Sequence, residues 1–165
     1  MCIRDSHLSD DGEYLEAHLV RSNPILKLLD APQPAKFSVT GGDCYVSPDW
    51  YGIVDQVPTW NYIAVHMIGK LEQLSPDKLP GILERLSAGM EARIPDKTPW
   101  KIDKMSSDVF DKMKQQIVPI GFRVTEITST WKLSQNKPEH VIKAAKLGIA
   151  EHPIGSEVMS LVDEM

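Results

Sequence analysis

Apolar and polar residues alternate along several stretches of the chain, and this alternation predicts β-strands. The longest stretch is residues 60–74, where both alternating faces are largely apolar, as is typical of a strand in the middle of a sheet. Residues 121–132 also alternate and would carry Trp131 and Lys132 to the end of their strand. The expected strands are 13–20, 36–40, 44–47, 60–74 and 121–132, with a turn at Gly41-Gly42-Asp43.

Helices are predicted where apolar residues recur at helical spacing after a capping residue and a proline. Asn23-Pro24 and Ser75-Pro76 are two such starts. The predicted helices are 24–29, 76–90, 107–117, 138–147 and one that begins near 155, and we expect Leu28, Val109, Met113 and Ile117 on buried sides.

The order of these elements predicts an α+β fold. Strands dominate the first half, two helices follow, and one more strand precedes the C-terminal helices, which favours an antiparallel sheet or barrel. We expect residues 12–148 to form the domain and 149–165 to be a C-terminal helical extension of it. Residues 1–11 are expected to be a non-native or disordered start, and no apolar core follows Arg4 as a signal peptide would require.

Composition narrows the function classes. The chain of 165 residues has a formal net charge of −5, which argues against unaided binding to nucleic acid because phosphate contacts need a basic face. Two cysteines without metal spacing predict free thiols and a cytoplasmic protein. No apolar run approaches the length of about 18 residues that spans a membrane.

The sequence motifs indicate neither a metal site nor a catalytic nucleophile. The five histidines occur in neither HxH nor HxxxH spacing, so we expect no metal site. Ser47, Ser134 and Cys44 lack a GxSxG turn, and we assign no catalytic residue.

Two clusters of polar and aromatic residues, 57–62 and 131–136, lie at ends of predicted strands. Amides and hydroxyls can bind the edge of a planar heterocycle, aromatic faces can stack on it, and Lys132 can bind a phosphate. The clusters therefore indicate a nucleotide-like cofactor. Taken alone, the first cluster is better explained as a buried aromatic pair with Asn61 capping a turn. The second, taken alone, is better explained as a strand end followed by a loop that caps the helix at Pro138.

Four motifs in the same order resemble the PaiB family of FMN-binding negative transcriptional regulators. HLVRSNP at 18–24 is similar to the family's HLxRxNP, and YVSPDWY at 45–51 to its YVSPxWY. VPTWNY at 57–62 and KLSQN at 132–136 match as they stand. The last two together are specific, and the resemblance extends over roughly residues 12–147.

The resemblance implies an FMN-binding split β-barrel of the flavin-reductase type, usually a homodimer with FMN at the subunit interface. Family members carry further strands ahead of the first motif, so we expect an N-terminally truncated member whose barrel is incomplete there. We expect the aromatic rings to lie beside the isoalloxazine, the amides at its pyrimidine edge and the cations at the phosphate. For each residue alone, a structural role is an equal alternative. The expected cofactor-binding residues are His18, Arg21, Trp60, Asn61, Tyr62, Lys132, Gln135 and Asn136.

Two functions stay open on the sequence alone. The first is a flavin-binding negative regulator of transcription or metabolism, whose direct contact with DNA is doubtful because the chain has no helix-turn-helix and no basic stripe. The second is a flavin-dependent oxidoreductase of unknown substrate, in which the cofactor carries the chemistry.

Overall fold

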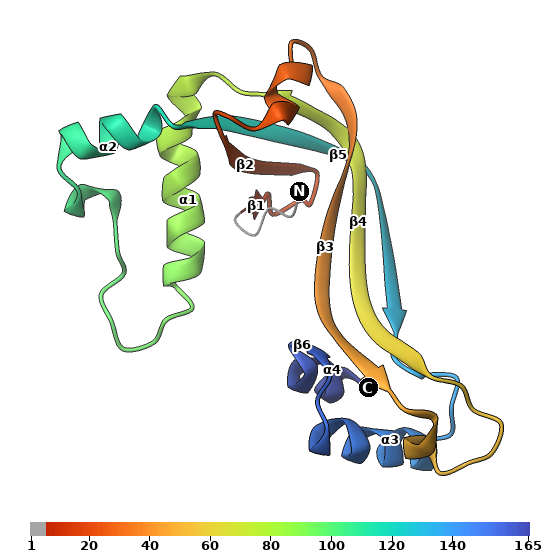
Figure 1. The fold of residues 1–165 in the computed structure, drawn as a ribbon. Helices are drawn as coiled ribbons and strands as arrows, with labels where there is room; N and C mark the ends of the chain where they lie inside the picture. Colours follow the sequence, from red (N-terminus) through yellow and green to blue (C-terminus); the bar gives the residue numbers. More distant parts are fainter. Residues whose placement is uncertain (1–5) are drawn as a thin grey trace. The chain divides into compact units, whose positions relative to one another are not determined.

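The computed structural model describes residues 6–165, and its contacts divide into two compact units. Each unit combines two separate stretches of chain: residues up to Lys36 with Met67–Glu126, and Phe37–His66 with Ile127–Met165. Figure 1 shows the elements. The strands are β1 (Ser6–Leu8), β2 (Tyr14–Val20), β3 (Gln33–Val46), β4 (Thr59–Gln73), β5 (Ile117–Lys132) and β6 (Gly155–Ser156), and the α-helices are α1 (Leu79–Glu91), α2 (Ser107–Lys114), α3 (Glu139–Glu151) and α4 (Val158–Glu164).

The strands form one sheet in the order β1-β2-β5-β4-β3-β6. The pairs β1–β2, β2–β5 and β3–β6 are antiparallel. The predicted class, α+β with a mainly antiparallel sheet and peripheral and C-terminal helices, is confirmed. The predicted central position of residues 60–74 is confirmed too, because β4 has a strand on either side.

The first unit is built around the pairing of β2 with the first half of β5. Leu15 lies opposite Phe122 and Ala17 opposite Ile120, and all four side chains are buried. A Cβ at Gly69 of β4 would lie 2.0 Å from the Arg123 carbonyl oxygen, so β4 approaches β5 closely only because this residue is glycine. α1 adds an apolar stripe of Leu79, Ile82 and Leu86 to the core.

The second unit has its own core. α3 packs against the 3-10 helix at Pro48–Tyr51, where a Cβ at Gly148 would lie 2.4 Å from the Trp50 ring, so the indole rests directly on the helix backbone. The ten buried residues of this core are Cys44, Val46, Tyr51, Leu133, Val141, Ala145, Ile149, Val158, Leu161 and Val162.

The turn predicted at Gly41-Gly42-Asp43 is wrong, because β3 runs through it as one strand. The two glycines serve close packing instead. A Cβ at Gly41 would lie 3.2 Å from the Ile63 Cβ, and one at Gly42 would lie 3.0 Å from the Leu161 Cβ. In this strand, glycine therefore marks the approach of neighbours rather than a change of direction.

Helix burial is also corrected. Leu28 and Met113 are 66% and 58% exposed, Val109 is exposed as well, and every residue of α2 is exposed or half-buried. Ile117 belongs to β5 rather than to the preceding helix. α2 has helical spacing but does not pack into the core; Phe110 and Met113 line a cavity instead.

The chain start differs in part from the prediction of a non-native or disordered stretch over 1–11. Ser6–Leu8 forms β1 and pairs with β2, with Ser6 opposite Ala17. Residues 1–5 lie outside the described part of the chain.

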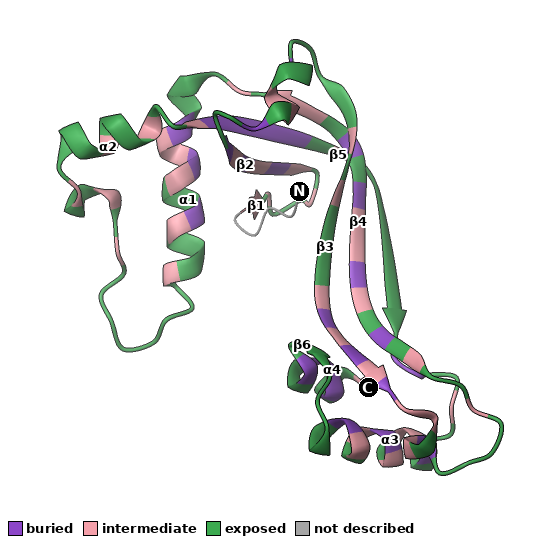
Figure 2. Cartoon of the chain, in the orientation of Figure 1, coloured by how far each residue is buried: buried purple, intermediate pink, exposed green. Residues whose placement is uncertain are grey.

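The two halves of β5 differ in exposure. Residues 118–122 are buried, whereas residues 125–132, which extend beyond the pairing with β2, are all exposed. Figure 2 shows this change along the strand. The second half therefore leaves apolar side chains such as Ile127 and Trp131 on the surface.

Candidate functional site

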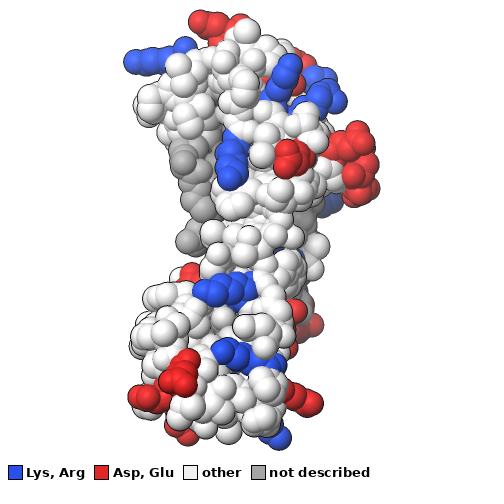
Figure 3. Space-filling model, turned by 90° about the vertical axis from the view of Figure 1, so that its right-hand side faces the viewer, with Lys and Arg blue, Asp and Glu red and all other residues white. Residues whose placement is uncertain are grey.

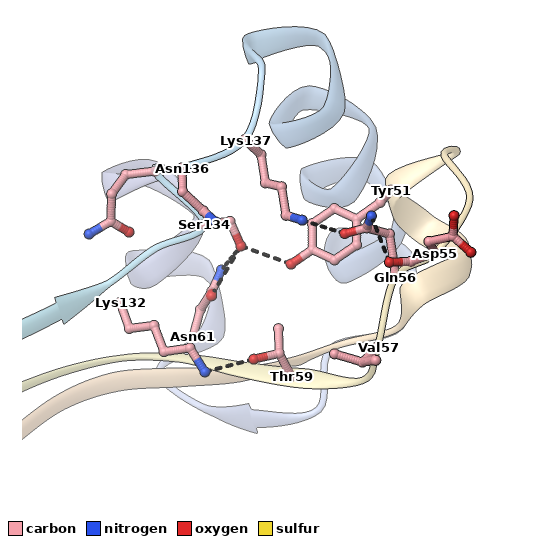
Figure 4. A pocket seen from close by; sticks show the side chains of 11 residues that line it. Tyr51, Asp55, Gln56, Val57, Thr59, Asn61, Lys132, Ser134, Asn136 and Lys137 are labelled. Carbon is pink, nitrogen blue, oxygen red and sulfur yellow. Dashed lines mark hydrogen bonds between the residues drawn. The ribbon is translucent and has the colours of Figure 1, made fainter.

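A polar pocket of about 270 Å³ lies in the second unit, where both sequence clusters meet. One wall is the turn after β5, and the other is the start of β4 with the loop before it (Figure 4). The lining residues are Tyr51, Asp55, Gln56, Val57, Thr59, Asn61, Lys132, Ser134, Gln135, Asn136 and Lys137.

The floor of the pocket is a buried hydrogen-bond network. The Ser134 hydroxyl lies 2.9 Å from the Tyr51 hydroxyl, 3.1 Å from the Asn61 amide nitrogen and 3.2 Å from the Asn61 amide oxygen. All three residues are buried, and Asn61 is fully enclosed. Since buried polar groups are costly unless partnered, this network holds β4, the turn after β5 and the Pro48–Tyr51 helix in one arrangement.

The turn after β5 is shaped by its own side chains. Ser134 adopts a left-handed conformation, with φ of 59°. The Gln135 amide oxygen accepts from the Leu133 backbone N–H at 2.7 Å, and its nitrogen donates to the Trp131 carbonyl. The Lys137 N–H then donates to the Ser134 carbonyl at 2.9 Å, which closes the turn.

Two lysines bring positive charge to the pocket. The Lys132 ammonium donates to the Thr59 hydroxyl at 2.7 Å. The Lys137 ammonium donates to the Gln56 amide oxygen and lies 5.3 Å from the centre of the Tyr51 ring. Both contact neutral oxygens, and Asp55 contributes one carboxylate to the lining. The pocket is therefore suited to a ligand that carries an anionic group.

The structure brings together four of the eight residues predicted to bind a cofactor: Asn61, Lys132, Gln135 and Asn136. Trp60 and Tyr62 are not part of this lining. They alternate with the enclosed Asn61 along β4 and are 46% and 37% exposed. Trp60 packs edge-on against Tyr45, with ring centres 6.1 Å apart.

His18 and Arg21 belong to the first unit, and neither lines the polar pocket. The Arg21 guanidinium donates to the Gln115 carbonyl at 2.6 Å and to the Ile117 carbonyl at 3.3 Å. Arg21 therefore fixes the end of β2 to the start of β5. His18 lines a different cavity, beside α1.

Seven of the eleven lining residues were not predicted as site residues, and three of these, Tyr51, Ser134 and Lys137, make the contacts described above. Tyr51 and Ser134 are members of the quoted motifs, and their place in YVSPDWY and KLSQN was the available signal. Lys137 directly follows the KLSQN motif and gave no signal of its own. Tertiary contact alone pairs it with Gln56.

Cys44 is a packing residue of the second unit. Burial raises the pKa of its thiol, and the raised pKa keeps the sulfur protonated at neutral pH. Cys44 is buried in the core of the second unit, which indicates a structural role.

Comparison with known proteins decides the family. Residues 5–126 match a family described as "Putative FMN-binding domain". The chain is also 30% identical to the protease synthase and sporulation protein PAI 2 of Bacillus subtilis over 157 residues, which cover 94% of this chain and 74% of that protein. The chain belongs to the PaiB family of FMN-binding proteins. The family predicted from the four motifs is thereby confirmed, and membership assigns FMN to the chain as its cofactor.

The chain is also similar to a yeast protein and to a solved bacterial structure. The uncharacterized protein YKL070W of Saccharomyces cerevisiae is 33% identical over 94 residues, which cover 53% of this chain and 56% of that protein. A solved structure, the FAD and heme binding protein of Mycobacterium smegmatis, aligns with a TM-score of 0.48 at 18% identity. That alignment covers 88% of this chain and 63% of the other, so the chain spans less than two thirds of that protein.

Two further observations concern residues 6–165. In this part of the chain, no helix is both long and apolar enough to cross a membrane. The same residues contain no group of three or more His, Cys, Asp and Glu side chains placed to hold a metal ion.

Proposed function

We propose that the polar pocket holds the phosphate-bearing end of FMN. The observation that carries the proposal is the pair of lysines, Lys132 and Lys137, whose ammonium groups face neutral partners in a pocket built from two family motifs. A phosphate can replace or share the Thr59 and Gln56 oxygens at these ammonium groups, and charge-assisted hydrogen bonds are roughly twice as strong as neutral ones.

The residues of the polar pocket fit a phosphate, and the size of the pocket limits how much of FMN it can hold. Asn61 and Ser134 are already bonded to one another, so they act as a rigid floor, whereas Asn136 and the two lysines supply side-chain donors at the rim. A volume of about 270 Å³ is at the low end of ligand pockets and suits part of the cofactor rather than all of it. When bound, FMN supplies redox chemistry that the side chains do not supply.

We further propose that a second copy of the chain completes the site. Four large apolar side chains on β4 and β5 in the same unit are exposed: Trp60, Tyr62, Ile127 and Trp131. Aromatic residues are enriched at protein interfaces, and exposed apolar clusters indicate association. In this proposal, Trp60 and Tyr62 lie in the dimer interface and contact the part of FMN that extends beyond the pocket.

At the level of biology, we propose a flavin-dependent negative regulator that acts in the cytoplasm, where a thiol such as Cys44 stays reduced. The relative from Bacillus subtilis carries the name of a protease synthase and sporulation protein. Figure 3 shows acidic side chains interspersed with basic ones on the face drawn, and the net charge is −5. This distribution favours regulation through flavin or protein contacts over tight binding to DNA.

FMN titration tests the proposal. Adding FMN to the purified protein in 0.15 M salt should quench flavin fluorescence and saturate at one FMN per chain, and sedimentation should show a dimer. Trp131→Lys should shift the protein to monomer and weaken FMN binding. A dimer that binds no FMN contradicts the pocket assignment, and a monomer that binds FMN fully contradicts the shared site. Reduction of bound FMN by NADH with multiple turnovers would instead favour an oxidoreductase.

A further inference from the structure

A second cavity, of about 350 Å³, lies entirely within the first unit. It is partly open to solvent and is lined by residues of β2, α1, the connection that leads from α1 to α2, α2 and the start of β5. Its lining is mainly apolar, with aromatic and aliphatic side chains, whereas most residues that line the polar pocket are polar. Leu83, Trp100, Phe110 and Met113 are among these apolar lining residues.

The wall formed by Trp100 is held in place by a charged contact. The Glu91 carboxylate at the end of α1 accepts from the Trp100 backbone N–H at 2.6 Å and lies 2.5 Å from the Lys97 ammonium. These contacts, that with Lys97 foremost, lower the pKa of Glu91, so the carboxylate stays ionised and keeps both contacts to a lower pH than an ordinary glutamate would. The connection from α1 to α2 is long, but at Trp100 it is hydrogen-bonded back to the end of α1.

α2 has an apolar side that faces this cavity instead of a packed core. Phe110 and Met113 are both lining residues, although α2 contributes no buried side chain within its described bounds. A helix normally gains its stability by burying such a side. A ligand in the cavity would supply the apolar contacts that α2 otherwise lacks.

The charge balance of the lining restricts the ligand. Lys114 is the only lysine or arginine among the lining residues, and its ammonium is paired with Asp111 at 2.7 Å and lies 4.7 Å from the Phe110 ring centre. A cation that is already neutralised gives little affinity for an anion. His18, Ser87 and Gln116 add further polar groups to the lining.

We propose that this cavity binds a small, uncharged, mainly aromatic molecule, and that this site is separate from the FMN site. The volume fits small-molecule pockets, which begin near roughly 300 Å³. It excludes an α-helix of a partner, whose diameter with side chains is about 10 Å. The aromatic class follows from Trp100 and Phe110, because both rings line the cavity and aromatic side chains pair favourably with another ring.

The test uses indole as a neutral probe and benzoate as an anionic one, with the full chain loaded with FMN. Titration calorimetry should show saturable indole binding with benzoate at least tenfold weaker. Ser87→Phe, which fills the cavity from α1, should weaken indole binding at least tenfold. Its control is Ala88→Phe, which adds the same ring at a neighbouring exposed position and should leave indole affinity within twofold.

A second readout is made on the wild-type protein, and a variant is needed only to assign one signal. In the nitrogen–proton spectrum of the wild-type protein, indole should shift the ring N–H signal of Trp100, assigned with Trp100→Phe, and leave those of Trp50, Trp60 and Trp131 unchanged. Absence of saturable indole binding, equal binding of benzoate, or a shift at the other tryptophans and not at Trp100 would overturn the proposal. FMN affinity is measured alongside, so failure of one site is distinguishable from failure of the other.

Discussion

Replacement of Lys132 by alanine is the sharpest test of the phosphate site. The ammonium of this side chain donates a 2.7 Å hydrogen bond to the Thr59 hydroxyl. A hydrogen bond to a charged group contributes about 1.5–3 kcal/mol when it is well formed. Because Lys132 is exposed, salt and water screen it, so we expect the lower end of that range, about 1.5 kcal/mol or roughly tenfold in FMN affinity.

The stability of the FMN-free protein should change little in the same variant. The lost bond is at the surface, and exposed pairs contribute roughly 0–1 kcal/mol. The combination of weaker FMN binding with unchanged unfolding separates a ligand contact from a structural one. A phosphate contact further requires that the effect of Lys132→Ala grows as salt is lowered from 0.15 M.

The assay is FMN titration by fluorescence, with riboflavin as a second ligand that lacks the phosphate. Lys132→Ala should weaken FMN binding and leave riboflavin binding nearly unchanged. Lys143→Ala is the matched control, because it removes the same charge from an exposed position on α3 outside the pocket. Equal losses for FMN and riboflavin, or an equal loss in Lys143→Ala, would refute the reasoning.

Three further predictions concern stability. Gly69→Ala should destabilise the protein by at least about 2 kcal/mol, measured by urea unfolding, because its Cβ would lie 2.0 Å from the Arg123 carbonyl oxygen; a loss under 0.5 kcal/mol would show that β4 can move away from β5. Ser134→Ala should cost about 1–3 kcal/mol, since it removes the shared partner of Tyr51 and Asn61 while keeping the strained backbone; an unchanged urea midpoint would mean that the network does not hold the floor. Acid should destabilise the protein because the pKa values of Asp77 and Glu91 are lowered in the folded state. The main causes are the hydrogen bond from Ser75 to Asp77 and that from Lys97 to Glu91. The two carboxylates stabilise the fold fully above their ordinary pKa values of 3.8 and 4.5, and this stabilisation is lost as the pH falls through their lowered pKa values. Glu91→Gln should therefore reduce the difference in unfolding free energy between pH 6 and pH 3, and an unchanged difference would remove Glu91 from the account.

The sequence was most informative where a local pattern determines structure by itself. Two apolar faces along residues 60–74 placed β4 in the middle of the sheet, and Asn23 caps the helix that starts at Pro24, as its side chain accepts from the Ile25 N–H at 3.0 Å. The failures came where a residue type has two uses. Gly41 and Gly42 were interpreted as a turn, although each makes room for a side chain from elsewhere in the unit.

The candidate site was predictable only in part for a similar reason. Alternation along β4 places Trp60 and Tyr62 on the face opposite Asn61, so only Asn61 lines the pocket. Contact of the other two with FMN stays a prediction. The hydrogen bond from Lys137 to Gln56 and that of Tyr51 with Ser134 each join residues about eighty positions apart. No local pattern specifies such pairs, and only the fold brings them together.

The interleaving of the two units has a consequence for how the protein is made. Residues of β2 pair with residues of β5 that are synthesised about a hundred positions later, as Leu15 does with Phe122. The first unit therefore cannot close until the chain has passed Glu126, and the second needs the stretch that begins at Ile127. During translation, β2 and β4 lack their shared neighbour β5, which slows folding and leaves their apolar faces exposed to aggregation. Cellular yield should consequently depend on chaperone supply and on the rate of translation after β4.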